Sequence, residues 1–141
     1  MVRHEYKNFA LNLPNNWLYE KEEGDIEACF DPTSKSTLRI HLMKLRPPVN
    51  ASQAEKIKVL TGGLQYTFTD FGYMLTIANV FQKHKNNDID LITWRIIKLP
   101  ENGEADIALL SYTVLSVEKD SEKERGIIND LEKSFKEAVF N

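Results

Sequence analysis

Cysteine is nearly absent from this chain of 141 residues, because Cys29 is the only one. A single cysteine excludes an intramolecular disulfide, and the chain gives no sign of an oxidising compartment. Histidine is also scarce, and no Cys-x-x-Cys or His-x-x-x-His pair occurs. Such closely spaced pairs are the usual sign of a metal site, so the sequence predicts neither a metal nor another cofactor.

The chain also has no large excess of either acidic or basic residues. The 18 basic and 21 acidic residues are spread along the chain, which predicts no nucleic-acid partner and no membrane partner. No apolar run reaches the roughly 18 residues that span a bilayer, and charges interrupt the N-terminus where a secretory signal needs an apolar core. We therefore predict a cytoplasmic protein, folded as a single domain over residues 1–141.

Two long apolar runs, residues 88–99 and 105–117, flank the dipeptide Asn102-Gly103. Both residues of this dipeptide tolerate the positive φ of a tight turn, so the pattern predicts a β-hairpin. Apolar side chains fall on both faces of the second run, and both faces therefore need cover. We expect an α+β fold with a single antiparallel sheet of about six to seven strands, flanked by helices on both faces.

Other segments of the chain supply the remaining elements of this sheet. Alternating polar and apolar residues predict strands over residues 6–13, 17–19, 26–30, 36–45 and 75–84. Two serines are each followed three residues later by a glutamate, which is the spacing of a helix capping box. They predict one helix from Ser52 to Gly62-Gly63 and a second from Ser121 to about Phe140.

Four residues were considered for catalysis or metal binding. A histidine that acts as a base must be held near a nucleophile and an acid. We expect His4 in a frayed start and His84 in a turn, so His41, on a strand, is the better candidate for a catalytic or ligand role. Cys29 has no basic neighbour in the sequence that would lower its pKa, so we expect a small buried hydrophobe.

An aromatic segment contains Tyr66, Phe68, Phe71 and Tyr73 within eight residues. If buried, these side chains would form the inner face of the sheet, which is the arrangement we expect. If exposed, they would form a protein interface, which remains the alternative. Arg95 lies in an otherwise apolar strand and must reach a carboxylate or solvent. We expect a salt bridge or an exposed strand centre there rather than a ligand anchor.

The opening Phe9-Ala10-Leu11-Asn12-Leu13-Pro14-Asn15-Asn16-Trp17 is followed by strands, a capped helix, a meander and a closing helix. This order, with the motif Leu13-Pro14-x-x-Trp17, resembles the PsbP-like superfamily, which includes the Ran-binding Mog proteins and the DcrB-type proteins. The resemblance implies an α/β/α sandwich that serves as an adaptor or accessory subunit more often than as an enzyme. The resemblance does not identify a binding partner, because a fold alone does not determine a function.

The missing catalytic constellation predicts a protein that is not an enzyme. Our first hypothesis is a protein-binding or accessory module, such as an adaptor or an immunity-type protein, whose partner is another protein. The alternatives are a small-ligand-binding protein or hydrolase with a pocket at the sheet, using His41, Arg39 or Arg95 as its polar groups, and a structural homodimer. A deep hollow in which His41 and an acidic side chain converge, or a bound ion, would contradict the prediction of no catalysis.

Overall fold

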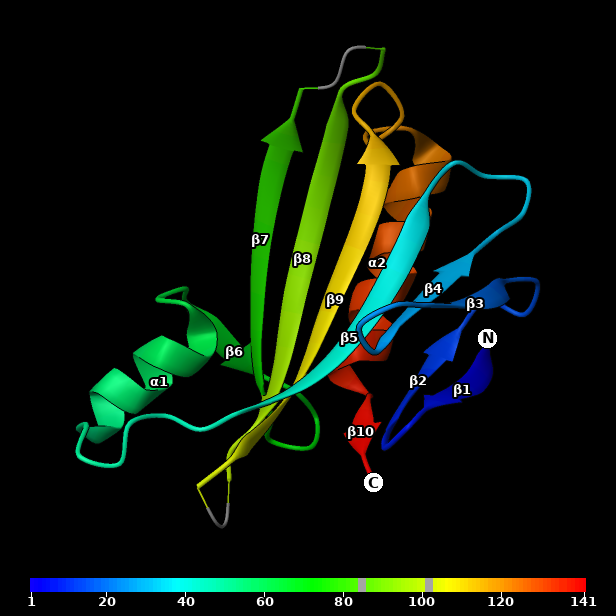
Figure 1. Cartoon of the computed structure of the whole chain (residues 1–141). Helices are drawn as coiled ribbons and strands as arrows, with labels where there is room; N and C mark the ends of the chain where they lie inside the picture. Colours follow the sequence, from blue (N-terminus) through cyan, green and yellow to red (C-terminus); the bar gives the residue numbers. More distant parts are fainter. Residues whose placement is uncertain (84–85, 101–102) are drawn as a thin grey trace.

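The computed structural model describes residues 1–83, 86–100 and 103–141. These residues form two helices and ten strands (Figure 1). The helices are α1 (Gln53–Thr61) and α2 (Glu122–Lys136). The strands are β1 (Val2–Tyr6), β2 (Phe9–Leu13), β3 (Leu18–Glu22), β4 (Ile26–Phe30), β5 (Thr37–Leu45), β6 (Tyr66–Phe68), β7 (Met74–Gln82), β8 (Ile89–Lys98), β9 (Ala105–Leu115) and β10 (Val139–Phe140).

Seven of these strands form the main sheet, in the order β3-β4-β5-β9-β8-β7-β6. Every neighbouring pair in this sheet is antiparallel, which confirms the predicted pairing. The central hairpin is confirmed by the ladder between β8 and β9, which runs from Ile89 opposite Leu115 to Lys98 opposite Asp106. The turn residue Asn102 and the histidine His84 lie outside the described residues.

A second sheet of three strands, in the order β1-β2-β10, corrects the prediction of a single sheet. The predicted strand over residues 6–13 is interrupted because Lys7 adopts a left-handed conformation with φ of 54°. The chain turns back there, and β1 pairs with β2. The last helix ends at Lys136 rather than near Phe140, and the residues after it form β10 beside β2.

The main core lies between one face of the main sheet and the elements that pack on it, which are α2 and the small sheet. Trp94 of β8 and Phe135 of α2 meet in this core with ring centroids 4.9 Å apart. Both side chains are fully buried. Removing each such side chain from water contributes about 1.5–3 kcal/mol, so this contact fixes α2 on the sheet.

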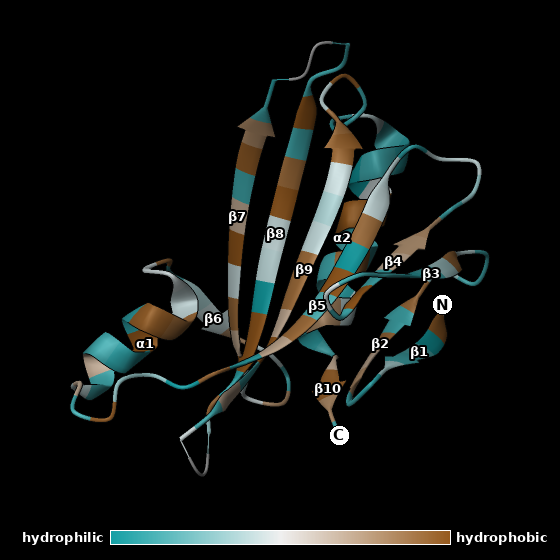
Figure 2. Cartoon of the chain, in the orientation of Figure 1, coloured by the Kyte–Doolittle hydropathy of each residue, from teal (hydrophilic) through white to brown (hydrophobic). Residues whose placement is uncertain are grey.

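The opposite face of the main sheet is covered only at one end. There Leu60 of α1 packs with Met74, Ile97 and Ile107 in a second, smaller core. Farther along the same face, side chains such as Thr93 and Leu109 remain partly exposed. The expectation that two helices keep both faces dry is therefore wrong, because α1 is short and lies at the end of the sheet (Figures 1 and 2).

Both helices begin at the predicted serines. The hydroxyl of Ser52 accepts a hydrogen bond from the backbone N–H of Glu55, and Ser121 does the same for Glu124. Each hydroxyl satisfies one of the free N–H groups in the first turn of its helix. Neither of the helices in the described part of the chain has the length and apolar character needed to cross a membrane.

Candidate functional site

A buried group of three side chains joins the N-terminal hairpin to the main sheet. It consists of His4 from β1 and of Glu27 and Cys29 from β4, and we call it the His-Glu-Cys cluster. His4 Nε2 forms a hydrogen bond with Glu27 Oε1, and the thiol of Cys29 lies 3.9 Å from the same oxygen. All three potential ligand atoms lie within 4.8 Å of one another.

The local sequence explains this arrangement. Glu27 and Cys29 are two residues apart on one strand, so their side chains point to the same face. On that face they meet His4, which the β1–β2 hairpin carries toward β4. The ring of His4 also stacks on Tyr19 of β3, with centroids 3.8 Å apart and planes 3° apart. The expectation of a frayed start for His4 is therefore wrong.

Cys29 is fully buried, as expected for a small hydrophobe. Burial raises the pKa of its thiol far above the ordinary value of 9.0, and the neighbouring Glu27 carboxylate raises it further. A cysteine acts as a nucleophile as its thiolate, and this environment favours the neutral thiol. The cluster is therefore unsuited to covalent catalysis by Cys29, whereas its nitrogen, oxygen and sulfur donors form a set that can hold a metal ion.

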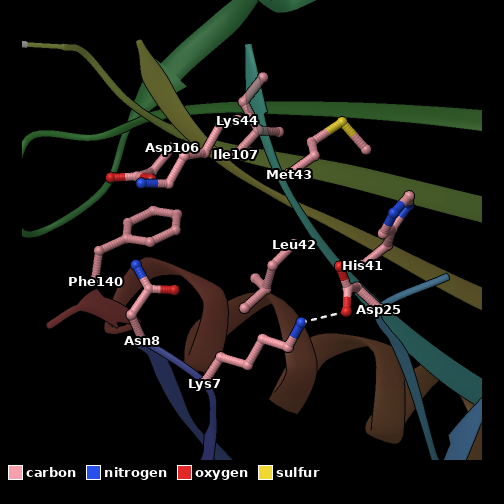
Figure 3. A pocket seen from close by; sticks show the side chains of 10 residues that line it. All are labelled: Lys7, Asn8, Asp25, His41, Leu42, Met43, Lys44, Asp106, Ile107 and Phe140. Atoms are coloured by element: carbon pink, nitrogen blue, oxygen red, sulfur yellow. Dashed lines mark hydrogen bonds and ion pairs between the residues drawn. The ribbon is translucent and has the colours of Figure 1, made fainter.

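His41 lies in a separate hollow between the two sheets, with a volume of about 420 Å³ (Figure 3). The acidic side chain of Asp25 lines the same hollow but pairs with Lys7, and Asp106 pairs with Lys44 at 3.9 Å. In Figure 3 the ring of His41 points away from the ion pair between Lys7 and Asp25. None of the described lining residues carries a hydroxyl or thiol that His41 could activate.

Arg95 supports the fold through a contact that the sequence did not indicate. Its Nη1 donates a hydrogen bond to the backbone carbonyl of Leu60, at 3.1 Å, in the last turn of α1. It forms no salt bridge with a described residue. A cation near the C-terminus of a helix also complements the helix dipole. Arg95 is half-buried and caps α1, so it forms neither the salt bridge nor the exposed strand centre that we expected.

The aromatic segment is mostly exposed, so the expectation that it forms an inner sheet face is wrong. Tyr66, Phe68 and Phe71 retain 39%, 64% and 58% of their accessible surface. Tyr73 is half-buried and packs edge-on against Phe140. The segment is exposed because β6, which carries Tyr66 and Phe68, is a three-residue strand at the edge of the main sheet.

The neighbouring strand β7 continues this apolar surface. Ile77, Val80 and Phe81 of β7 are each about half exposed, with exposed fractions of 53%, 48% and 57%. β6 pairs only with the segment Met74 to Thr76, so from Ile77 onward β7 has no strand beside it on that side among the described residues. We call the exposed apolar side chains of β7, together with those of the aromatic segment, the apolar edge.

A groove of about 350 Å³ lies beside the apolar edge, between β6, β7 and α2. Tyr66, Leu75, Ile77 and Trp94 supply its apolar lining, and α2 contributes charged side chains. The indole N–H of Trp94 is buried and has no hydrogen-bond partner among the described residues. Buried donors are nearly always paired, so this N–H is an exception within the core.

The sequence predicted His41 and Arg95 as polar groups of one pocket and the aromatic segment as a separate site. In the structure His41 lines the hollow between the sheets, whereas Arg95 caps α1. Sequence reasoning missed His4 and Glu27, because they lie 23 positions apart and meet only through the small sheet. The one local signal was the alternation of Glu27 and Cys29 on a predicted strand, which places an acid beside the cysteine. Short metal-binding motifs have ligands only a few positions apart, so they do not reveal a pair of ligands this far apart in the sequence.

A crystal structure of a protein from Bacteroides thetaiotaomicron VPI-5482 has a similar fold, with a TM-score of 0.61 and 17% sequence identity. The superposition covers 95% of this chain and 45% of that protein, so the chain spans less than half of its length. At this identity the likeness shows the fold alone. No protein-family model matches the sequence, and no curated protein matches it either.

Proposed function

We propose that this protein is a non-catalytic binding module, of the adaptor or immunity type, that binds another protein through its apolar edge. The observation that carries the proposal is the exposed part of β7 from Ile77 onward, with its unpaired backbone and large apolar side chains. Proteins usually cover or charge such an edge, because it is a template for pairing with another chain. An apolar strand edge that is neither covered nor charged is therefore best explained as the binding surface for another protein.

The partner that fits this surface is an extended segment of another protein that adds a strand beside β7. Main-chain hydrogen bonds to β7 would supply affinity, and alternate side chains would supply specificity. On the α2 side, one partner side chain would enter the groove lined by Leu75, Ile77 and Trp94.

The test replaces Ile77 and Phe81 together with lysine and compares the proteins captured from the native host with those of the unchanged protein. We expect every specific partner to be lost or weakened by on the order of tenfold, because two apolar contacts become charged. The matched control is Leu18→Lys. Leu18 is 51% exposed on β3, the strand at the opposite edge of the same sheet, so this variant should keep the partner.

A partner that is lost equally from the Leu18→Lys variant, or kept by the double variant, contradicts this surface. Light scattering of the purified protein separates the two kinds of occupant. A dimer that the double variant dissociates identifies the partner as a second copy, which is the homodimer alternative. A monomer identifies it as a different protein.

We also propose membership of the PsbP-like superfamily. The support is Leu13-Pro14-x-x-Trp17, in which the backbone N–H of Trp17 donates to the carbonyl of Pro14 at 3.3 Å and the indole enters the core. A further support is the antiparallel sheet with α1 and α2 packed against opposite faces. A crystal structure superposed on members of that superfamily tests the proposal, and a different strand order would contradict it.

The small-ligand alternative has weaker support. Its hollow contains His41, but the cations and acids around it neutralise one another, as the pairs of Lys7 with Asp25 and of Lys44 with Asp106 indicate. Specific ligand sites rely on a few polar groups free to bind the ligand. Chemical-shift changes at His41 on addition of a small-molecule library would favour this alternative over the protein-binding module.

A further inference from the structure

We propose that the His-Glu-Cys cluster is a binding site for a divalent transition-metal ion, with Zn²⁺ as the best match. The ligands are His4 Nε2, Glu27 Oε1 and Cys29 Sγ, and a fourth position remains open for water or another ligand. This site shares no residue with the apolar edge, so it does not depend on the proposed function.

The positions of the three atoms are close to those of a tetrahedral zinc site. Zinc bonds of roughly 2.0–2.3 Å place neighbouring ligand atoms about 3.3–3.8 Å apart. Cys29 Sγ and Glu27 Oε1 lie 3.9 Å apart, close to this range. His4 Nε2 and Glu27 Oε1 are closer because they form a direct hydrogen bond. A small rotation of the imidazole away from the carboxylate opens the space that an ion would take.

The surroundings hold the ligands in position. Glu27 and Cys29 lie on β4, which pairs with β3 on one side and with β5 on the other. The imidazole of His4 is kept flat against the ring of Tyr19 by stacking at 3.8 Å. Packing that fixes the orientation of a ligand strengthens metal binding, because the ordering cost has already been met.

The charge of the cluster also suits a dication. Glu27 is only 6% exposed, and among the described residues no lysine or arginine lies within salt-bridge distance of its carboxylate. A carboxylate buried without a strong cationic partner is costly. When the ion binds, the Cys29 thiol proton leaves to solvent, and His4 binds the ion through Nε2 as a neutral imidazole with its proton on Nδ1. One thiolate, one carboxylate and a neutral imidazole then balance the two positive charges.

The ligand atoms select the kind of metal. Ca²⁺ and Mg²⁺ prefer oxygen ligands alone, whereas imidazole and thiolate suit Zn²⁺. The side chain of His4 keeps 15% of its accessible surface, so an ion can reach the cluster from the side of the N-terminal hairpin. Three protein ligands with one open position is the arrangement of zinc sites that exchange a water or another ligand.

The experiment titrates Co²⁺ into the full chain and follows its absorption, and then displaces Co²⁺ with Zn²⁺. We expect one ion per chain and a thiolate-to-cobalt charge-transfer band in the near ultraviolet. In the Cys29→Ser variant this band should disappear. The His4→Gln and Glu27→Gln variants should bind Zn²⁺ weaker by on the order of tenfold or more, as measured by competition with a chelating dye.

His41→Gln is the matched control, because His41 lies outside the cluster and its loss should leave the band and the affinity unchanged. Far-ultraviolet circular dichroism of each variant without metal shows whether it is folded. If Cys29→Ser fails to fold, the two glutamine variants decide the question. Cobalt bound without the thiolate band, or zinc affinity unchanged in the folded His4→Gln and Glu27→Gln variants, overturns the proposal.

Discussion

Gly62 shows how a single residue ends one element and contacts another. It adopts the left-handed conformation with φ of 67° and forms the C-cap of α1. A Cβ atom at this position would lie 3.0 Å from Nη1 of Arg95, the group that caps the same helix end. A side chain here would therefore strain the backbone and displace the arginine.

We predict that Gly62→Ala lowers the free energy of unfolding by about 1–2 kcal/mol, the cost of the left-handed conformation for an L-residue. Urea unfolding followed by circular dichroism measures it. The control is Gly126→Ala within α2, where a Cβ would meet no atom within 4 Å and the backbone is not left-handed. That variant should gain about 1 kcal/mol from helix propensity. Equal effects of the two substitutions would contradict this explanation.

For single residues, the sequence predicted which side chains are buried better than it predicted which groups they contact. The apolar surroundings of Cys29 in the sequence sufficed to predict that it is buried. The proximity of His4 to this cysteine could not be predicted, because the left-handed residue of the turn between β1 and β2 is Lys7, and lysine does not usually signal that conformation. Likewise, nothing near Arg95 in the sequence indicates that a carbonyl of α1 would lie within reach.

Among the elements, α2 is attached to the main sheet by a buried polar contact. The carboxylate of Glu124, in the first turn of α2, accepts hydrogen bonds from Tyr112 at 2.7 Å and from Ser36 at 3.0 Å. All three side chains are buried. Burial raises the pKa of Tyr112 above its ordinary value of 10.0, and the bond to Glu124 raises it further.

This raised pKa predicts how stability depends on pH. The unfolded chain loses the Tyr112 proton near pH 10.0 while the folded chain keeps it, so the contribution is complete below that pH and declines above it. We predict that Tyr112→Phe costs about 1.5–3 kcal/mol at pH 7, as expected for a hydrogen bond to a charged group. The difference from the unchanged protein should shrink as the pH rises above 10.0, as measured by urea unfolding at each pH.

Ser36→Ala is the control for this prediction, because it removes a hydrogen bond to the same carboxylate without removing a group that titrates in this range. Its cost should stay nearly constant between pH 7 and alkaline pH. If the cost of Tyr112→Phe were equally constant, the raised pKa would not contribute to stability.

Long elements with strong periodicity were predicted well, and short ones were not. The β8–β9 hairpin and the start of α2 follow from alternation and capping, which are local signals. β6 and β10 have three and two residues and form only because a neighbouring strand accepts them. Tertiary pairing also ended α2 at Lys136, although the apolar periodicity continues beyond it.

At the scale of the whole molecule, Phe140 connects the small sheet to the core. Its ring packs on Phe9 with centroids 5.1 Å apart and on Tyr73 at 5.2 Å, while its backbone N–H donates to the hydroxyl of Tyr73. It therefore joins β2 of the small sheet to the loop that leads into β7 of the main sheet.

We predict that Phe140→Ala lowers the free energy of unfolding by about 3 kcal/mol, as for other buried phenylalanines. Thermal unfolding by calorimetry should show one transition at a lower temperature, because the two sheets share one core. Phe81→Ala is the control, since Phe81 is exposed on β7 and its loss should change stability by less than about 0.5 kcal/mol. Two separate transitions in the Phe140→Ala variant would contradict a shared core.

The layers of the fold could be predicted only in part. The sequence indicates an antiparallel sheet with a helix packed on it, because the periodicity of apolar residues shows which side chains must be buried against another element. It does not report how far a helix reaches, so the open part of the face beyond α1 could not be predicted. The exposed β7 edge was missed for the same reason, because Ile77 and Phe81 look like core residues in the sequence.

The pairing of β10 with β2 has a consequence for biosynthesis. Ala10 and Phe9 receive their strand neighbours, Val139 and Phe140, only after nearly all of the intervening chain has been made. Contacts between such distant positions are slow to form. The first hairpin therefore stays incompletely paired until residues 139 and 140 have left the ribosome, and the closure of the small sheet is a late step in the folding of this segment.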